Sequence, residues 1–283
     1  MNPKLVRRFR SARDYSVIYI GITIITFLFA FPFFWMVSTS LKPVHELFAV
    51  IPTLIPVMPT LDHYIHVWTN TIFPSAFRNS VIVATSTTFI TLIFSIFFAY
   101  GIARFRFRGR ILVINLLLLT QMFPLSLLII VIFVAFAQIG LIDSYIGLII
   151  AHCTFALPFA TIMLRSFFNE LPIELEEAAA IDGCSPYKTI FRIIIPLSGP
   201  AIAAMGIFAF ILSWQELMMS MTLIRSESMR TVPVMVNMMI GFMEVLWGPL
   251  MATISLITIP VVLIFIYFQK LMISGMTMGA IKG

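Results

Sequence analysis

Six separate stretches of this sequence are apolar for long enough to cross a membrane, and no other feature restricts the fold so strongly. They cover about residues 16–39, 78–103, 111–137, 145–167, 199–224 and 248–270. A spanning helix needs roughly 20 apolar residues, because a rise of about 1.5 Å per residue must cross a hydrocarbon core about 30 Å thick. Lipid offers no partners to backbone N–H and C=O groups, so each stretch is predicted to be a helix. The sequence therefore predicts an all-α membrane protein with six transmembrane helices and both termini on one side.

The composition agrees with this class, since 60% of residues are hydrophobic and 11% are charged, as in polytopic membrane proteins. The net charge of +6 does not indicate nucleic-acid binding, because the basic residues stand at the ends of apolar runs. Cys153 and Cys184 are too few for a disulfide framework, and no metal-ligand spacing occurs. The first apolar run is too long for a signal peptide, and we interpret it as a retained anchor.

The distribution of basic residues predicts the orientation of the chain. Fourteen lie on one side of the predicted membrane, at Lys4, Arg7, Arg8, Arg10, Arg13, Arg104, Arg106, Arg108, Arg110, Arg165, Lys188, Arg192, Lys270 and Lys282. The other side carries only Lys42, Arg78, Arg225 and Arg230. Basic loops stay in the cytoplasm, so both termini are predicted there. We expect a cytoplasmic segment 1–15, a membrane domain 16–271 with a cytoplasmic loop 168–196, and a cytoplasmic tail 272–283.

Two outer segments are less regular. Residues 40–77 form a proline-rich loop in which Tyr64 and Trp68 are expected at the membrane interface, as in aromatic belts. Residues 225–247 are rich in methionine and semi-apolar. The composition of this second segment predicts a re-entrant helix, an interfacial helix or a surface for a partner.

The cytoplasmic loop is predicted to hold two short helices. Pro172 is expected at the start of the first, where its missing N–H costs nothing, and Gly183 just past its end. Three glutamates crowd its first turns, where the positive end of the helix dipole favours them; they are Glu174, Glu176 and Glu177. In the second helix Ser185 is expected to cap, Pro186 to follow at the first position and Pro196 to end the helix.

An amphipathic linker lying on lipid is the alternative for this loop. Such a linker would carry Lys and Arg on its polar face and bulky apolar residues opposite. The first helix here is acidic and has a narrow alanine face at 178–180. That chemistry favours insertion into a protein cleft lined with arginine.

The same residues carry a resemblance to a known family. Glu177, Ala178, Ala179, Gly183, Ile193 and Pro196 match the EAA signature of ABC importer permeases, in which Leu usually stands where this chain has Ile195. Further likeness to the carbohydrate-uptake branch, closest to the maltose-transporter-type smaller permease subunit, covers roughly 78–283. Its segments are RNS at 78–80, AYGIARFRFRGR at 99–110, QMFP at 121–124, LPIELEEAAAIDG at 171–183, WQEL at 214–217 and GMTMGAIKG at 275–283. WQEL departs from the usual Trp-Asn-Glu-Phe.

The resemblance implies type I ABC importer permease architecture in the plasma (inner) membrane of a prokaryote. It implies a homologous second permease subunit, two copies of a separate ABC ATPase, an extracytoplasmic solute-binding protein and a sugar substrate. The chain has no G-x-x-x-x-G-K-[ST] loop, so no cofactor is expected on it, and ATP and Mg²⁺ are expected on the ATPase. The loop would dock into the ATPase through the signature residues and Asp182. Glu177 would pair with or cap an ATPase arginine, and Gly183 would allow the turn.

A translocation path is predicted from four polar or aromatic residues in or near the spans: Gln121, Trp214, Gln215 and Glu216. Glu216 is the only acidic residue inside a predicted span, and burial of a carboxylate in lipid is costly enough to suggest function. Trp214 would offer a stacking face, and the other side chains hydrogen-bond acceptors. Alternatively, Glu216 and Gln121 bind neighbouring helices or backbone. His152 and Cys153 are expected in the packed core.

Other functions remain as alternatives. An ABC importer could carry a polyol or a glycerophosphodiester in place of a sugar. A stand-alone secondary transporter would need coupling-ion carboxylates, of which the spans offer only Glu216, and it would leave the 171–196 helices without a role. The sequence does not specify which sugar is carried, or which permease subunit contacts it.

Overall fold

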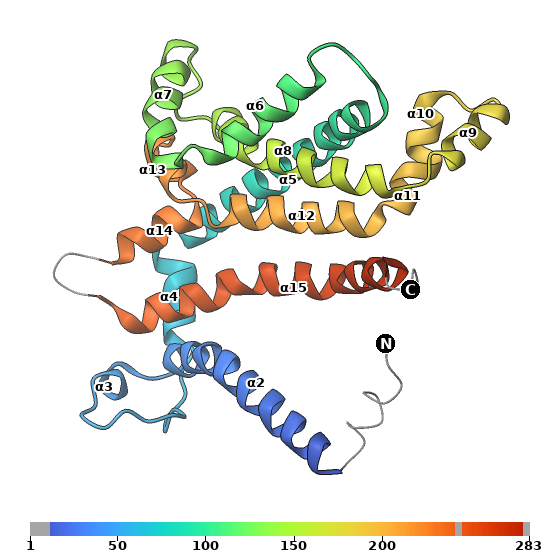
Figure 1. Cartoon of the computed structure of the whole chain (residues 1–283). Helices are drawn as coiled ribbons and strands as arrows, with labels where there is room; N and C mark the ends of the chain where they lie inside the picture. Colours follow the sequence, from blue (N-terminus) through green and yellow to red (C-terminus); the bar gives the residue numbers. More distant parts are fainter. Residues whose placement is uncertain (1–11, 241–244, 280–283) are drawn as a thin grey trace. The chain divides into compact units, whose positions relative to one another are not determined.

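The computed structural model describes residues 12–240 and 245–279, and the described part is almost entirely helical (Figure 1). Within it the only β feature is an isolated bridge between Ile240 and Val245. The chain divides into two compact units. Described residues before Ile72, with those between Met239 and Leu256, form the first unit; Ile72–Met238 and the described residues from Ile257 onward form the second.

The first unit contains α2 (Ala12–Ser40), α3 (Val44–Leu47), α4 (Asp62–Asn70) and the start of α15 (Trp247–Gly279). A buried polar cluster orders its proline-rich loop. The Glu46 carboxylate accepts hydrogen bonds from the Thr53 hydroxyl and from Val57 N at 3.1 Å, while Lys42 donates to the Thr53 carbonyl. The Thr53 hydroxyl bond holds the pKa of Glu46 below its usual value, although burial opposes the shift. The loop therefore has its own fixed structure.

Tyr64 and Trp68 differ in their surroundings within this first unit. The Tyr64 hydroxyl lies 2.6 Å from the Ser40 hydroxyl, so its polar end is used inside the protein. The Trp68 side chain is 53% exposed. Its place at a membrane interface stays a prediction.

Three long helices form the scaffold of the second unit: α5 (Phe73–Arg104), α8 (Tyr145–Glu170) and α12 (Gly199–Trp214). They run side by side in Figure 1 and pack through small, fully buried residues, among them Ala84, Ala99, Ala151, Ala160 and Ala209. Small side chains allow helix backbones to approach closely, which is the usual basis of helix packing in lipid. This scaffold positions both candidate sites described below.

Among the described residues, four helices are long and apolar enough to cross a membrane unbroken: α2, α5, α8 and α15. The prediction of a single helix at 111–137 is wrong. The segment forms α6 (Arg110–Met122) and α7 (Leu125–Gln138), bent by 106°. Pro124 cannot donate a helical hydrogen bond, and Phe123 before it is extended (ψ 128°), as the residue before proline prefers.

The predicted span 199–224 also differs from the structure. It forms α12 and then a separate short helix, α13 (Met218–Leu223). The segment Pro186–Leu197 that precedes α12 is bent by 82° from it. Six spans result only if each of these two bent pairs counts as one span. The break at 215–217 is important because it contains Gln215 and Glu216, two of the four predicted path residues.

The segment after α13 contains a 3₁₀ turn (Glu227–Met229) and α14 (Val232–Met239), so a helix lies in the predicted 225–247 region, while residues 241–244 are outside the described part. Asn79 of the RNS motif holds this segment. Its amide donates to the carbonyls of Ser228 and Arg230 at 2.8 and 2.9 Å, and its oxygen accepts from the Tyr145 hydroxyl at 2.7 Å. The motif is therefore a structural brace in this chain.

Asp143 anchors the same segment from the loop between α7 and α8. Its carboxylate accepts hydrogen bonds from the Ser226 hydroxyl and from the backbone N–H groups of Ser226 and Arg225. The Ser226 hydroxyl is the main reason that the pKa of Asp143 lies below its usual value. Asp143 has a positive φ of 57°, which is uncommon outside glycine and which aspartate tolerates better than most residues.

Candidate functional site

The first candidate site is the loop after α8, which forms α9 (Glu174–Ile181), α10 (Pro186–Thr189), a π-helical turn (Ile190–Ile194) and α11 (Ile195–Leu197). Figure 1 shows these elements beyond the end of α8. The first helix begins at Glu174, so the prediction that Pro172 starts it is wrong by two residues. The helix α8 continues to Glu170, and Leu171–Ile173 is used as the connection.

The end of α9 confirms the predicted turn. Gly183 has φ +77°, a conformation that costs glycine little. The N–H of Gly183 bonds to the Ala180 carbonyl at 3.0 Å and that of Cys184 to the Ala179 carbonyl at 2.9 Å. The last carbonyls of the helix are thereby satisfied.

The second helix also begins as predicted. Pro186 stands in its first turn, and the Ser185 hydroxyl accepts a long 3.5 Å hydrogen bond from Lys188 N. Pro196, however, does not end the helical path, which continues to Leu197. A wider π turn at Ile190–Ile194 directly precedes Pro196. Proline cannot bond to the carbonyl four residues earlier, and the π turn accommodates that loss.

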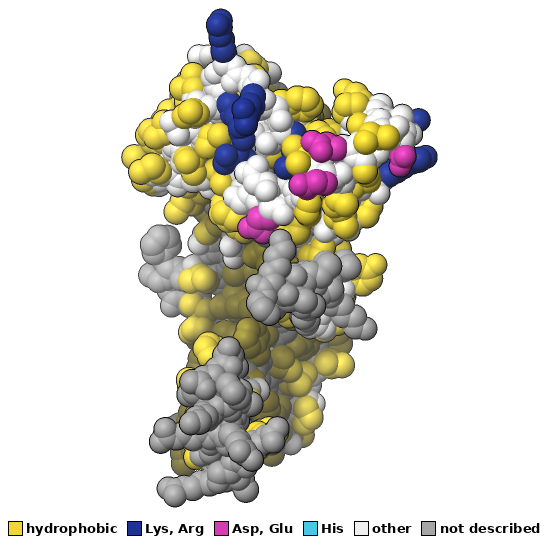
Figure 2. All heavy atoms as spheres, turned by 45° about the vertical axis from the view of Figure 1, so that its right-hand side comes forward, with side chains coloured by type: hydrophobic (Ala, Val, Ile, Leu, Met, Phe, Trp, Pro, Cys, Tyr) yellow, Lys and Arg dark blue, Asp and Glu magenta, His cyan; other side chains and the backbone are white. Residues whose placement is uncertain are grey.

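The signature residues of this loop are mostly open to solvent. Ala179 is buried and Ile193 half-buried, while the others are exposed, namely Glu177, Ala178, Asp182, Gly183 and Pro196. Large apolar side chains stand among them, with Ile181 87% and Tyr187 71% exposed. In Figure 2 acidic and basic side chains also gather where α9 and α10 come forward. An exposed surface that combines apolar and charged groups is typical of a protein interaction site.

One glutamate of α9 differs from its neighbours. The Glu176 carboxylate accepts from Arg104 Nε at 2.6 Å and from the Tyr100 hydroxyl at 2.8 Å, both on the last turns of α5. From the sequence, Glu176 is expected only to stabilise the helix dipole together with Glu174 and Glu177, and this ion pair was not predicted. The only available signal was that Arg104 is the first of a basic run at the end of a predicted span.

The second candidate site lies at the break between α12 and α13. Glu216 is in the break and caps α13, because its carboxylate accepts from Met219 N at 2.8 Å and from Ser220 N at 3.0 Å. The prediction that Glu216 lies within a continuous span is therefore corrected. Its Oε2 is also 3.3 Å from His152 Nε2, and His152 Nδ1 is 2.7 Å from the Ser213 hydroxyl.

His152 is buried in the core, as predicted, at 1% exposure. Its role as the partner of Glu216 was not predicted. Cys153 next to it makes only long contacts, with its sulfur 3.8 Å from the Thr91 hydroxyl. Both Cys153 and Cys184 are free thiols, in agreement with the prediction that they do not pair.

Of the predicted path residues, the structure brings two together. Gln215 and Glu216 line a cavity of about 440 Å³ with His152 and Phe155. Gln121 lies at the end of α6 and donates a long 3.4 Å hydrogen bond to the Phe155 carbonyl. Gln215, Glu216 and His152 give the cavity hydrogen-bonding groups on an otherwise apolar wall, and Gln121 is not among its lining residues.

Trp214 does not join them. Its indole N–H donates to the Ile257 carbonyl at 3.2 Å, and its ring stacks on Phe210 with centroids 5.4 Å apart. Phe77 contacts the same ring edge-on at 5.7 Å. The predicted free stacking face of Trp214 is thus occupied by the core.

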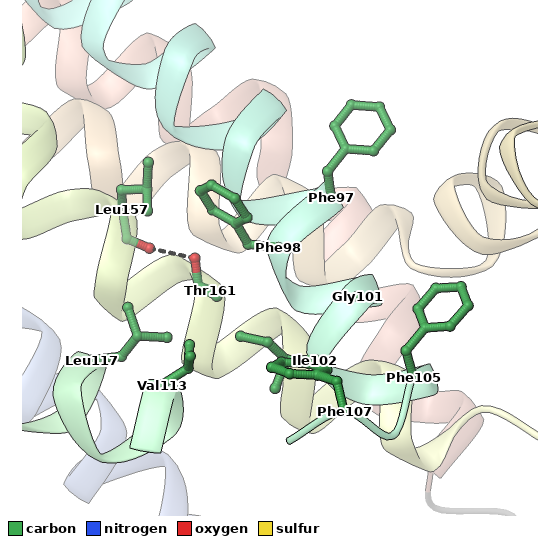
Figure 3. Close-up of a pocket in the computed structure, with 10 residues that line it drawn as sticks. All are labelled: Phe97, Phe98, Gly101, Ile102, Phe105, Phe107, Val113, Leu117, Leu157 and Thr161. Atoms are coloured by element: carbon green, nitrogen blue, oxygen red, sulfur yellow. Dashed lines mark hydrogen bonds between the residues drawn. The ribbon is translucent and has the colours of Figure 1, made fainter. Parts of the chain in front are cut away.

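A second cavity of about 390 Å³ lies between α5, α6 and α8 (Figure 3). Phe98, Val113 and Leu157 are among its lining residues, and the Thr161 hydroxyl donates to the Leu157 carbonyl at 2.7 Å. Its one hydroxyl is therefore already engaged. A polar solute would find no free side-chain partner among the residues that line it.

Long apolar helices, two bent helix pairs and an exposed loop with the EAA pattern define a membrane transport subunit. The family described as binding-protein-dependent transport system inner membrane component matches residues 91–278. The chain belongs to this family, and it is a permease subunit of an ABC importer, located in the inner membrane and not itself catalytic.

Relatives and solved structures agree. The Escherichia coli inner membrane ABC transporter permease protein YcjP is 33% identical, over 94% of this chain and 95% of the relative. The trehalose/maltose transport system permease protein MalG of Thermococcus litoralis is 35% identical over 93% and 95%. A solved bacterial ABC transporter for import of the acidic polysaccharide alginate matches with a TM-score of 0.81 and 23% identity, covering 92% and 97%. These matches establish the type I importer fold.

Proposed function

We propose that this chain forms half of a translocation path for a carbohydrate and is driven by a separate ABC ATPase. A homologous second permease subunit would supply the other half, and two ATPase copies would bind the pair. ATP and Mg²⁺ would be held by the ATPase and not by this chain. Closure of the ATPases around ATP would displace the loop 168–196 and rock the spans between inward-open and outward-open states.

The observation that carries this proposal is the exposed surface of α9 and α10. In the described residues Glu177 has no hydrogen-bond or ion-pair partner, and it lies between exposed apolar side chains such as Leu175 and Ile181. A carboxylate in such a surface suits an arginine of a docked partner. Ala178 and Ala179 would keep the helix narrow enough to enter a cleft, and Asp182 and Gly183 would form its turn. Ile193 and Pro196 would orient the helix that follows.

A test compares Glu177→Ala with Glu174→Ala, a second exposed glutamate of the same helix. The complex is purified in mild detergent from its native membrane, and the copurified ATPase is quantified. Glu177→Ala should weaken docking by about 2–5 kcal/mol, the cost of truncating one partner of a buried charge pair. Glu174→Ala should retain the ATPase. Wild-type recovery of ATPase and transport in Glu177→Ala would exclude this role.

The carbohydrate substrate is supported by the relatives. Their names include trehalose, trehalose/maltose and arabinooligosaccharide transport system permeases. The cavity at the α12–α13 break provides Gln215 and Glu216 as hydrogen-bonding groups, which sugars require. Gln121, which donates a long hydrogen bond to the Phe155 carbonyl, would extend this path, whereas Trp214 would act only through the core.

Uptake of labelled trehalose and maltose by cells that depend on this transporter would test the path. Gln215→Ala should reduce uptake while membrane insertion is unchanged, since Gln215 is exposed and makes no hydrogen bond through its side chain in the described residues. Unchanged uptake of whichever sugar the wild type carries would remove Gln215 from the path. If neither sugar is taken up, polyols and glycerophosphodiesters are the next candidates.

An extracytoplasmic solute-binding protein would deliver the sugar to the outer side. One solved relative of the fold is a bacterial alginate ABC transporter in complex with alginate pentasaccharide-bound periplasmic protein, with a TM-score of 0.67. The proposed orientation places both termini and the loop in the cytoplasm. In a Cys153→Ala variant, Cys184 of the loop should react with an impermeant thiol reagent in inside-out vesicles only. Labelling of Cys184 in right-side-out vesicles would contradict this orientation and place the loop on the outer side.

A further inference from the structure

The Glu176 cluster joins the ends of three helices. Arg104 and Tyr100, on the last turns of α5, both donate to the Glu176 carboxylate of α9. A second nitrogen of the Arg104 guanidinium donates at 3.2 Å to the carbonyl of Leu171, the residue that directly follows α8. The Arg104 and Glu176 side chains are only 11% and 12% exposed. The cluster is therefore a partly buried, directional contact and not a solvated surface pair.

We propose that Glu176, Arg104 and Tyr100 form a positioning joint that transmits the displacement of α9 to the transmembrane helix α5. This inference rests on the proposed function, in which an ATPase docks on the loop. The joint fixes where α9 stands relative to the end of α5. Without it, α9 would be free to move while α5 stayed in place.

The rest of the loop is attached by a different kind of contact. Ile190 and Ile194 of the π turn belong to a buried apolar cluster with Tyr100, Leu164 and Phe168. Apolar packing is not directional, so it holds the second half of the loop without fixing the azimuth of α9. Tyr100 belongs to both contacts, because its ring lies in the apolar cluster and its hydroxyl binds Glu176. The two halves of the loop thus meet on one residue of α5.

The adjacent residues Glu176 and Glu177 of α9 have different surroundings and are assigned different roles. Consecutive residues of a helix point about 100° apart, and here Glu176 faces α5 while Glu177 is exposed. Glu177 is proposed to face the ATPase, and Glu176 faces the membrane helix. The two roles can be separated by mutation because each glutamate can be changed without its neighbour.

The test uses the purified importer complex with ATP, Mg²⁺ and vanadate, which need no knowledge of the sugar. Nitroxide labels on cysteines at Phe89 of α5 and Leu263 of α15, both exposed, report the distance between these helices in a background without the native cysteines. In the wild type, vanadate trapping should shift this distance. In Glu176→Gln the distance should stay at its nucleotide-free value, while the ATPase still copurifies and still hydrolyses ATP.

Charge reversal distinguishes positioning from a general loss of structure. Glu176→Arg combined with Arg104→Glu should restore the shift that either single reversal abolishes. Tyr100→Phe, which removes only a hydroxyl, should fold normally and reduce the fraction of shifted molecules. A wild-type shift in Glu176→Gln, no shift in the wild type itself, or no rescue in a complex that still assembles would each overturn the joint.

The same preparation separates this inference from the proposed function. Glu177→Gln should lose ATPase from the purified complex and leave the Glu176 contact intact. If Glu177→Gln keeps its ATPase and the wild type shifts, docking through Glu177 is wrong and the joint stands. If Glu177→Gln loses its ATPase and Glu176→Gln shifts normally, docking stands and the joint is wrong.

Discussion

Two places in this chain interrupt a helical path with a capped short helix, and they are built in opposite ways. At the loop after α9, Gly183, Ser185 and Pro186 form an exposed turn whose bonds are mostly local. At the break before α13, the cap is Glu216, which is largely buried and contacts His152, 64 residues earlier in the chain. The first break is specified by its own residues, and the second depends on a distant helix.

This difference separates local from tertiary control of helix ends. Glycine, serine and proline change the backbone preference wherever they occur. The ends of the short helices in the loop can therefore be predicted from the sequence. The residues at 215–217 are Gln, Glu and Leu, which are all good helix formers. A buried carboxylate is costly unless it is hydrogen-bonded or paired. The N–H groups at the start of α13 and the His152 ring satisfy Glu216, and this arrangement requires the break.

The largest expected effect comes from removing the buried cap. Glu216→Ala should destabilise the folded protein by about 3 kcal/mol, because α13 loses its cap and a nitrogen of buried His152 loses its partner. Thermal unfolding in detergent measures the change. Glu216→Gln, which keeps one acceptor oxygen, should lose less. Equal unfolding midpoints for wild type and Glu216→Ala would show that the contacts of Glu216 do not stabilise this break.

Gly183→Ala tests the exposed break and should cost about 1–2 kcal/mol, the penalty for an L-residue in the left-handed conformation. A Cβ at this position meets no atom within 4 Å, so backbone strain is the only expected cause. Gly183→Asn is the matched control, since asparagine tolerates this conformation better. Equal stability of the alanine and asparagine variants would contradict the assignment of this cost to φ.

Ser185→Ala should have a smaller effect, about 0.5 kcal/mol, at the low end for loss of an N-cap. The bond that it removes is long and exposed. The unfolding midpoint of the purified protein measures this loss, and Ser185→Asp should recover it. A loss of stability as large as that of Glu216→Ala would mean that the exposed cap depends on a tertiary contact, and would contradict the conclusion that this turn is held by local bonds.

Asp143 should show the smallest effect, and only as a dependence on pH. Its pKa is lowered in the folded protein, chiefly by the Ser226 hydroxyl, so its contribution is present above the unfolded pKa of about 3.9 and is lost as pH falls through the folded value. Asp143→Asn should therefore destabilise slightly at pH 7, and the difference should disappear at an acidic pH below the folded value. A variant that is destabilised equally at both pH values would show that charge is not the cause.

Much of the fold could be predicted from the sequence, because lipid leaves an apolar stretch little choice except a helix. The unbroken spans α2, α5, α8 and α15 agree with four of the six predicted stretches. The bend at Pro124 could also have been predicted, since proline and the residue before it disfavour a continuous helix. It was not, because the apolar run is long enough for one continuous span. The short helices of the loop were predicted to within about two residues at their ends.

The candidate sites were less accessible. The sequence identified Glu177 and Glu216 as unusual, but it gave no reason to separate Glu176 from its neighbours or to pair His152 with Glu216. Those assignments require knowing that Arg104 ends beside α9 and that α8 passes the break after α12. Trp214 is the converse case, because only the packing of Phe210 and Phe77 shows that its ring is not free.

The sequence by itself determined that this chain is a helical membrane protein, where its four unbroken apolar helices lie among the described residues, and where an exposed capped loop interrupts the helical path. These properties follow from hydrophobicity and backbone preference, which act over a few neighbouring residues. The tertiary structure decided which carboxylates are partnered: Glu176 by α5, Glu216 by α8 and by the start of α13, and Glu177 by no described residue. Partners are set by the approach of helices distant in the chain, and a charge out of water needs them.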